Sequence, residues 1–220
     1  KIKSSVMTGL ICELIFCFCM CIGVAQGGDE PKSGNHNCTA SWGFYGHKRI
    51  NRMAVFTLPP ELFTFYKKHI EFITEHAVDP DKRRYAVDGE APRHYIDIDH
   101  YANNGESPFV TMPKKWEDAV AKFTEDTLTA YGIVPWHLDV MVKRLSSAFR
   151  DKNLDLILRL SADLGHYTGD AHVPLHTTVN YNGQLTGQYG IHGFWESRVP
   201  ELIAEDWDYF VGKAQYIETP

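Results

Sequence analysis

The segment between residues 154 and 176 constrains the fold of this chain more than any other. Residues 154–169 are apolar enough to predict a central helix buried among other helices. The segment nevertheless ends in four side chains that can bind metal, all within eleven residues: His166, Asp170, His172 and His176. His166 and Asp170 are four residues apart, so a helix projects both from one face. The segment therefore predicts a buried helix whose last turn carries a metal site.

An ordinary polar or capping role is the alternative for each of these histidines taken singly. The density of the cluster favours metal binding, as does the total of 11 histidines in 220 residues. The net charge of −6 argues against a basic groove that grips nucleic acid through its phosphates alone. If the substrate is a phosphodiester, bound metal would have to supply the positive charge.

The remainder of the chain also has helical spacing. Apolar residues recur with the helical period in several segments, and no segment sustains period-two alternation. We therefore predict an all-α fold with a single domain. The expected helices, besides 154–169, span 46–58, 61–76, 116–131, 135–150 and 192–205. Residues 77–113 are expected to be mostly irregular, and the Gly/Asn/Thr-rich stretch 177–190 to be a loop.

The N-terminal residues are typical of a targeting segment. A short basic start precedes an apolar run over 6–25, which predicts a secretory signal at 1–25, with a membrane anchor as the alternative. Four of the five cysteines lie within this run, so the exported part would have no internal disulfide. Residues 26–41 are expected to be a leader that is removed, leaving a secreted or periplasmic domain at 42–220. No obligate protein partner is indicated, and we expect a monomer.

Further candidate ligands lie outside the segment. His192 and Glu196 form a second pair at i, i+4, with a solvated helix face as the alternative. Trp42 precedes His47 by five residues, and an aromatic residue at the start of a helix would explain it equally. Asp79 and His94 bracket a polar stretch in which other carboxylates are rivals for the same role: Asp81, Asp88, Asp97 and Asp99.

As an ordered set, these residues resemble a known superfamily. The set comprises W-x-x-x-x-H at 42–47, Asp79 followed by His94, H-x-x-G-D-x-H-x-P-L-H at 166–176 and H-x-x-x-E at 192–196. It resembles the three-zinc phosphodiesterases, which include bacterial zinc-dependent phospholipases C and single-strand nucleases of the P-one type. The resemblance runs from Trp42 to about Glu201, and the family fold is all-α. Glu196 matches the phospholipases, whereas the 42–47 spacing and the run His94-Tyr-Ile-Asp97 are closer to the nucleases.

The resemblance implies a ligand set for three zinc ions. One zinc would take Asp79, His94, His166 and Asp170, and a second would take His176, His192 and Glu196. The third would take His47, a shared oxygen of Asp170, and the backbone nitrogen and carbonyl oxygen of Trp42. The last pair needs a free amine, so the implied mature N-terminus is Trp42. His172 matches a family position that supports ligands without binding zinc.

The chemistry implied is hydrolysis of a phosphodiester, either in a phospholipid or in single-stranded nucleic acid. Zinc would generate hydroxide near neutral pH, and Asp79 is the candidate catalytic residue that orients the attacking water. Arg83 or Arg84 could neutralise the phosphate, although a solvated basic run is the alternative. A non-catalytic helical binding domain held together by zinc is the rival function.

Overall fold

The computed structural model describes residues 43–102, 105–207 and 209–217, and within these ranges the chain is helical without a β-strand. The prediction of an all-α fold is confirmed. The predicted signal at 1–25, the leader at 26–41 and the ligand Trp42 lie outside the described residues. Within the described part of the chain, no helix has the length and apolar character needed to cross a membrane.

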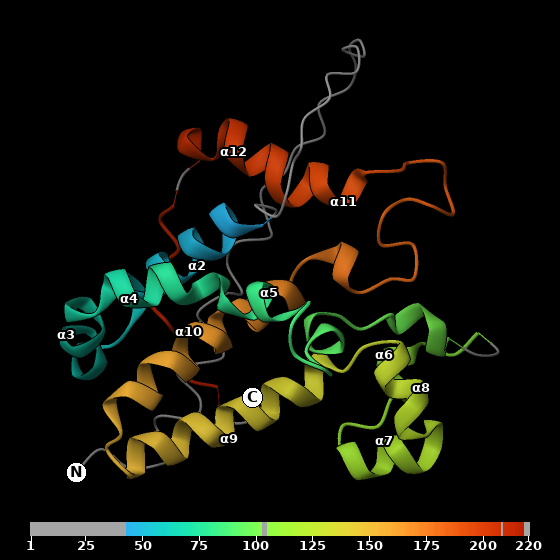
Figure 1. Ribbon diagram of the computed structural model, residues 1–220, viewed down its shortest axis with the longest axis horizontal. Coiled ribbons are helices and arrows are strands. Elements are labelled where there is room, and N and C mark those ends of the chain that lie inside the picture. The colour runs from blue at the N-terminus through green and yellow to red at the C-terminus, as the bar shows by residue number, and fades with distance from the viewer. Residues whose placement is uncertain (1–42, 103–104, 208, 218–220) are drawn as a thin grey trace.

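The two longest helices form an antiparallel hairpin at the base of the molecule (Figure 1). They are α9 (Val134–Arg150) and α10 (Leu154–Ala171). Asn153 caps α10, since its side-chain oxygen accepts the N–H of Leu156 at 3.1 Å. Apolar side chains of both helices, with those of α2, α3 and α4, form one core that includes Leu145, Leu164 and Tyr167. The apolar stretch of the sequence is therefore the buried central helix that was predicted.

Helix α2 (Phe44–Thr57) lies against α10 because a glycine permits close approach. A Cβ on Gly165 would lie only 2.0 Å from Oδ1 of Asn51. The Asn51 amide in turn donates to the carbonyl of Ala162 at 3.0 Å. This contact brings His47 of α2 over His166 of α10, with ring centroids 3.9 Å apart.

The predicted helices at 61–76 and 116–131 are each broken into shorter ones. The expected helix at 61–76 comprises α3 (Pro60–Lys68) and α4 (Ile70–Glu75), which η2 (His76–Val78) follows. The expected helix at 116–131 comprises α7 (Trp116–Phe123) and α8 (Glu125–Ala130). Thr124 separates α7 from α8 with a φ of 70°, and its side chain caps α8 by accepting the N–H of Thr127. A hydroxyl that satisfies the backbone locally competes with a continuous helix.

Short helical turns occupy much of 77–113, which was expected to be mostly irregular. They are α5 (Asp79–Arg83), η3 (Ala91–His94), η4 (Ile98–Tyr101) and α6 (Pro108–Thr111). A further turn, η5 (Pro174–His176), precedes the predicted loop. The expected helix at 192–205 is a succession of α11 (Ile191–Gly193), the π-helix η6 (Phe194–Arg198), α12 (Val199–Ile203) and η7 (Ala204–Asp206).

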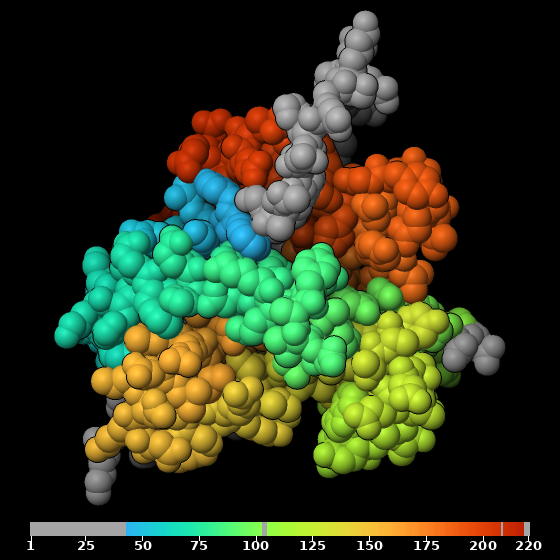
Figure 2. Space-filling model, viewed as in Figure 1, coloured from blue at the N-terminus to red at the C-terminus, as the bar shows by residue number. Residues whose placement is uncertain are grey.

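The C-terminal helices cover the face of α2 opposite the hairpin. Figure 1 shows α12 above α2, and the space-filling view in Figure 2 shows the orange and red segment meeting the blue one. A hydrogen bond ties the two together, because Ser197 of η6 accepts the backbone N–H of Gly43 at 2.7 Å. The hairpin, α2 and η6 thus converge on one buried region of polar side chains.

Candidate metal centre

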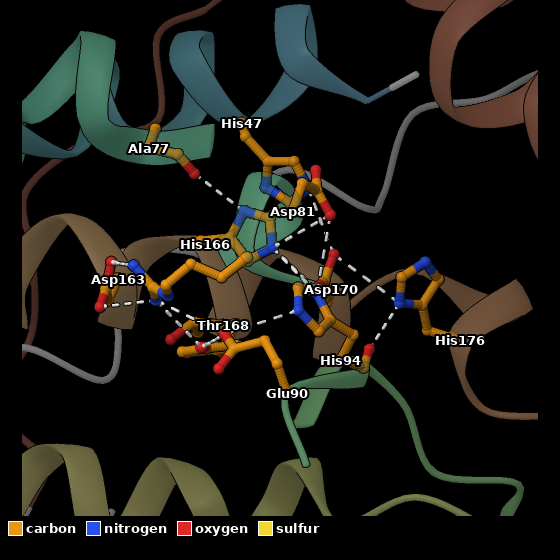
Figure 3. A network of polar contacts seen from close by, with 12 residues as sticks. His47, Ala77, Asp81, Glu90, His94, Asp163, His166, Thr168, Asp170 and His176 are labelled. Carbon is orange, nitrogen blue, oxygen red and sulfur yellow. Dashed lines mark hydrogen bonds and ion pairs between the residues drawn. The ribbon is translucent and has the colours of Figure 1, made fainter. Parts of the chain in front are cut away.

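Three groups of histidine and carboxylate side chains meet in this region. Figure 3 shows the first two groups and His176 of the third. Within each group the ligand atoms lie within 4.8 Å of one another. The groups are His47, His166 and Asp170; Asp81, His94 and His166; and His176, His192 and Glu196. Groups of this donor type and spacing are compatible with metal binding.

Asp170 lies at the centre and contacts members of all three groups. Its Oδ1 is 3.2 Å from Nε2 of His47 and 3.7 Å from Nδ1 of His176. Its Oδ2 is 2.9 Å from Nδ1 of His94 and 3.2 Å from Nε2 of His166. Oδ1 of Asp170 therefore faces His47 and His176, and Oδ2 faces the other two histidines. This arrangement is compatible with the prediction that Asp170 is shared between sites.

The charges in this cluster depend on one another. Burial opposes ionisation of Asp170, yet the imidazoles of His166, His176 and His47 hold the pKa of its carboxyl well below the usual range. Burial likewise opposes protonation of His47, and Asp170 outweighs it and raises the pKa of His47. At His166 burial dominates, with the neighbouring His47 adding to it, so its pKa is lowered.

Backbone carbonyls fix the orientation of three imidazoles from outside the cluster. Nδ1 of His166 donates to the carbonyl of Ala77 at 2.8 Å, and Nδ1 of His176 donates to that of His94 at 2.6 Å. His192 makes the same kind of contact with Tyr181 at 3.2 Å. A proton on Nδ1 leaves the Nε2 lone pair facing inward, which is the arrangement a metal ligand requires.

The ring nitrogens of His94 and His166 converge, which bears on whether a cation fits between them. Nδ1 of His94 and Nε2 of His166 approach to 3.1 Å, and the carboxylate of Asp170 lies against both. His166 and His94 are both fully buried. Lone pairs and a carboxylate that face one another out of water are electron-rich, so a divalent cation suits the donor set.

The expected ligand Asp79 is not part of these groups, and Asp81 is present instead. Asp81 Oδ1 lies 3.7 Å from both Nδ1 of His94 and Nε2 of His166. The Asp79 carboxylate contacts His76 at 2.5 Å and Lys82 at 2.9 Å. The candidate set is therefore corrected, with Asp81 in place of Asp79. Asp81 faces α10, whereas Asp79, the first residue of α5, pairs with its neighbours along the chain.

The third group is the more open one. Glu196 of η6 contacts Nε2 of His176 at 2.7 Å and Nε2 of His192 at 3.0 Å. Burial opposes its charge, but the hydrogen bonds from these two histidines lower the pKa of Glu196 to about 2. Burial also opposes protonation of His176, whereas Asp170 and Glu196 raise its pKa to about 9. These three residues are the set that the resemblance implies for one zinc ion, and the structure brings them together.

A cavity of about 340 Å³ opens beside this third group. Its wall is polar and aromatic and includes Arg84, Tyr95, Asp97, Tyr181, His176 and His192. The volume lies within the range of small-molecule sites, roughly 300–1,000 Å³. Burial, with the Asp99 carboxylate, raises the pKa of Asp97 to about 6. Asp97 and Asp99, both rivals for metal in the sequence, are absent from the three groups found among the described residues.

The remaining predicted residues flank the cluster. His172 ends α10, and its Nδ1 donates to the carbonyl of Thr168 at 2.8 Å, which supports the turn that leads to His176. Gly43 lies at the start of α2, where a Cβ would be 3.5 Å from His47 Cδ2 and 3.9 Å from Glu196 Oε2. The described chain therefore begins beside two of the candidate ligands.

A buried carboxylate that the sequence did not indicate lies behind the cluster. Glu90 is 1% exposed and contacts Arg83, Arg93 and the hydroxyl of Tyr167. Burial opposes its charge, but these neighbours, Tyr167 first, lower the pKa of Glu90. Arg83 also pairs with Asp163 of α10 at 2.9 Å, and its side chain remains partly exposed. Several other acidic residues lie in the same stretch, and nothing in the sequence distinguishes Glu90 from them.

No family model, curated protein or solved structure matches this chain. The resemblance to three-zinc phosphodiesterases consequently rests on the ordered residues of the sequence alone.

Proposed function

We propose that this chain is a zinc-dependent phosphodiester hydrolase whose three groups hold three zinc ions. The observation that carries the proposal is the position of Asp170, whose two carboxylate oxygens lie within 3.2 Å of inward-facing ring nitrogens of the first two groups. A carboxylate in this position would hold neighbouring metals at a fixed separation. Bound zinc would lower the pKa of a water towards neutrality and stabilise charge on the phosphate.

The third group supports catalysis in preference to a purely structural metal. A structural zinc has four protein ligands, whereas a catalytic zinc keeps a position open for water or substrate. His176, His192 and Glu196 supply three side chains, and two of them line the cavity. The His192 side chain is 26% exposed, so this group is reached from solvent.

The cavity wall supplies what a phosphodiester substrate requires besides metal. Arg84 brings a guanidinium, which binds phosphate oxygens with directed hydrogen bonds. Tyr95 and Tyr181 bring rings against which a flat or apolar group can pack. Tyr95 and Asp97 belong to the run that resembles the nucleases, and both line the cavity, so we favour single-stranded nucleic acid over phospholipid.

The test is a parallel assay of zinc-loaded protein on single-stranded DNA, single-stranded RNA and phosphatidylcholine. We expect metal-dependent cleavage of the nucleic acids, lost in His166→Ala because that residue belongs to two groups. The matched control is His69→Gln, a histidine between α3 and α4 outside the three groups. It should retain wild-type cleavage.

Each outcome separates one alternative. Cleavage of phosphatidylcholine alone would keep the hydrolase and overturn the nucleic-acid preference. Zinc binding without cleavage of any of the three substrates would favour the non-catalytic domain held by zinc. Equal cleavage by wild type and His166→Ala would contradict the metal site as the source of activity.

A further inference from the structure

One imidazole of the cluster is oriented differently from its neighbours. His166, His176 and His192 each direct Nδ1 to a backbone carbonyl and Nε2 to the cluster. His94 is reversed: its Nδ1 faces Asp170 and His166, at 2.9 and 3.1 Å. Its Nε2 is buried on the far side, where no residue that the structure describes makes a hydrogen bond with it.

The group that faces this nitrogen is the Glu90 carboxylate. Oε1 of Glu90 lies 3.9 Å from Nε2 of His94, which is an ion-pair distance and longer than a hydrogen bond. A ring nitrogen that cannot reach water or a carbonyl is costly to leave unpaired. Among the described residues, Glu90 thus occupies the position that a carbonyl occupies for His166, His176 and His192.

Three neighbours hold the Glu90 carboxylate in place. Arg93 donates to Oε2 at 2.7 Å, Arg83 lies 3.5 Å from Oε1, and the hydroxyl of Tyr167 donates to Oε1. These contacts join α5, η3 and α10, the three elements that carry the ligands Asp81, His94 and His166. A fixed acceptor behind His94 would therefore also fix the group to which His94 belongs.

We propose that Glu90 is a positioning residue that keeps the proton of His94 on Nε2, so that the Nδ1 lone pair faces the metal. The proposal deepens the proposed function and depends on metal binding at that group. A carboxylate behind a metal-bound histidine orients the ring and raises its basicity. The competing view is that Glu90 serves only as a partner for Arg83 and Arg93.

Nitrogen-15 NMR of histidine-labelled, zinc-loaded wild-type protein tests the orientation directly. We expect His94 to carry its proton on Nε2 and to bind metal through Nδ1, whereas His166 and His176 show the opposite assignment. Binding of His94 through Nε2 would overturn the proposal. This measurement uses wild-type protein, so it does not depend on whether a variant folds.

Zinc affinity, measured by competition with a chromogenic chelator, tests the role. We expect Glu90→Gln to weaken zinc binding by about 10- to 100-fold, the usual effect of removing an outer carboxylate. Zinc content at saturation should be unchanged, because every ligand remains. The matched control is Asp163→Asn, which removes the other carboxylate of Arg83 and leaves Glu90 and His94 intact. It should shift the metal-free melting temperature without changing zinc affinity.

The outcomes distinguish this inference from the function on which it rests. Wild-type affinity in Glu90→Gln, or an equal loss in Asp163→Asn, would overturn the positioning role while leaving the hydrolase standing. Absence of zinc from wild type would overturn both. If Glu90→Gln does not fold, Glu90→Asp replaces it, since it keeps the charge for Arg83 and Arg93 and withdraws the carboxylate from His94. We then expect a weaker affinity in the same direction.

Discussion

Two carboxylates on α5, two residues apart, have different surroundings. Asp81 lies between two buried histidines, whereas Asp79 pairs with His76 and Lys82. We expect Asp81→Asn to weaken zinc binding by at least about 100-fold, because losing a ligand costs no less than losing its outer partner. Asp79→Asn, the matched control, should bind zinc as wild type does. Chelator competition measures both, and the opposite ranking would restore Asp79 as the ligand.

The sequence contained a sign of this difference, although the spacing alone could not reveal it. Asp79 has a histidine three residues before it and a lysine three residues after it, and side chains at this spacing meet on one helical turn. Local partners leave a carboxylate less available for a distant site. Asp81 lacks the histidine but has Arg84 three residues after it, so this sign is incomplete, and only the path of 84–93 places Asp81 against His94.

Asp97 gives the stability of the protein a distinctive pH dependence. Burial and Asp99 raise its pKa to about 6, from a usual value of 3.8. The folded state therefore binds this proton more tightly than the unfolded state. Its contribution is complete below about pH 3.8 and is lost as the pH rises through about 6.

Asp97→Asn removes this ionisation and should therefore change the pH profile. The free energy of unfolding of the variant minus that of wild type should therefore increase between about pH 4 and pH 7. Parallel urea unfolding of the two proteins at both pH values measures the difference. A difference that is constant with pH, or that favours wild type more at the higher pH, would contradict the raised pKa.

Among the helices, the contact between α2 and α10 positions the first candidate group, His47, His166 and Asp170. Gly165→Ala would place a methyl group 2.0 Å from the present position of Asn51 Oδ1. We expect a loss of about 1–3 kcal/mol in the free energy of unfolding, as is usual for overpacking. Separation of the helices should also weaken zinc at His47, which calorimetric titration with zinc would detect.

Gly46→Ala provides the matched control on the facing helix. A Cβ there would approach only the carbonyl oxygen of Glu196, at 3.9 Å. Alanine is favoured over glycine within a helix by about 0.5–1 kcal/mol, so this variant should be at least as stable as wild type. A Gly165→Ala protein as stable as Gly46→Ala would show that close approach does not determine this packing.

The sequence predicted helices well where packing follows the apolar period, and less well where local chemistry intervenes. The expected 135–150 and 154–169 correspond to α9 and α10 within a few residues, because both have one continuous buried face. Thr124 interrupts a helix through its own hydroxyl, and Glu196 lies in the π-helix η6 where a regular α-helix was expected. Neither feature alters the apolar spacing, so periodicity could not reveal them.

At the scale of the molecule, the candidate ligands lie on many separate elements, several of them very short. Helices of five residues or fewer, such as α5 and η3, are unstable alone and depend on tertiary contacts. A metal that joins them to α2 and α10 would therefore stabilise the fold as well as the site.

Chelation should accordingly lower the melting temperature. Zinc at 100 times its dissociation constant adds about 2.7 kcal/mol, which corresponds to about 5–10 °C for a domain of this size. Circular dichroism with and without chelator measures the shift. Hydrogen exchange should show the greatest loss of protection in α5, η3 and η6, and less in the α9–α10 hairpin. An unchanged melting temperature would count against a metal that joins these elements.

We propose that the cluster around Asp170 is a metal centre. Elemental analysis of purified protein beginning at Trp42 tests it most directly, because it depends on neither the substrate nor the mechanism. We expect about three zinc ions per chain, one for each group of converging side chains. Fewer than about one zinc per chain, after dialysis against zinc-containing buffer, would contradict it.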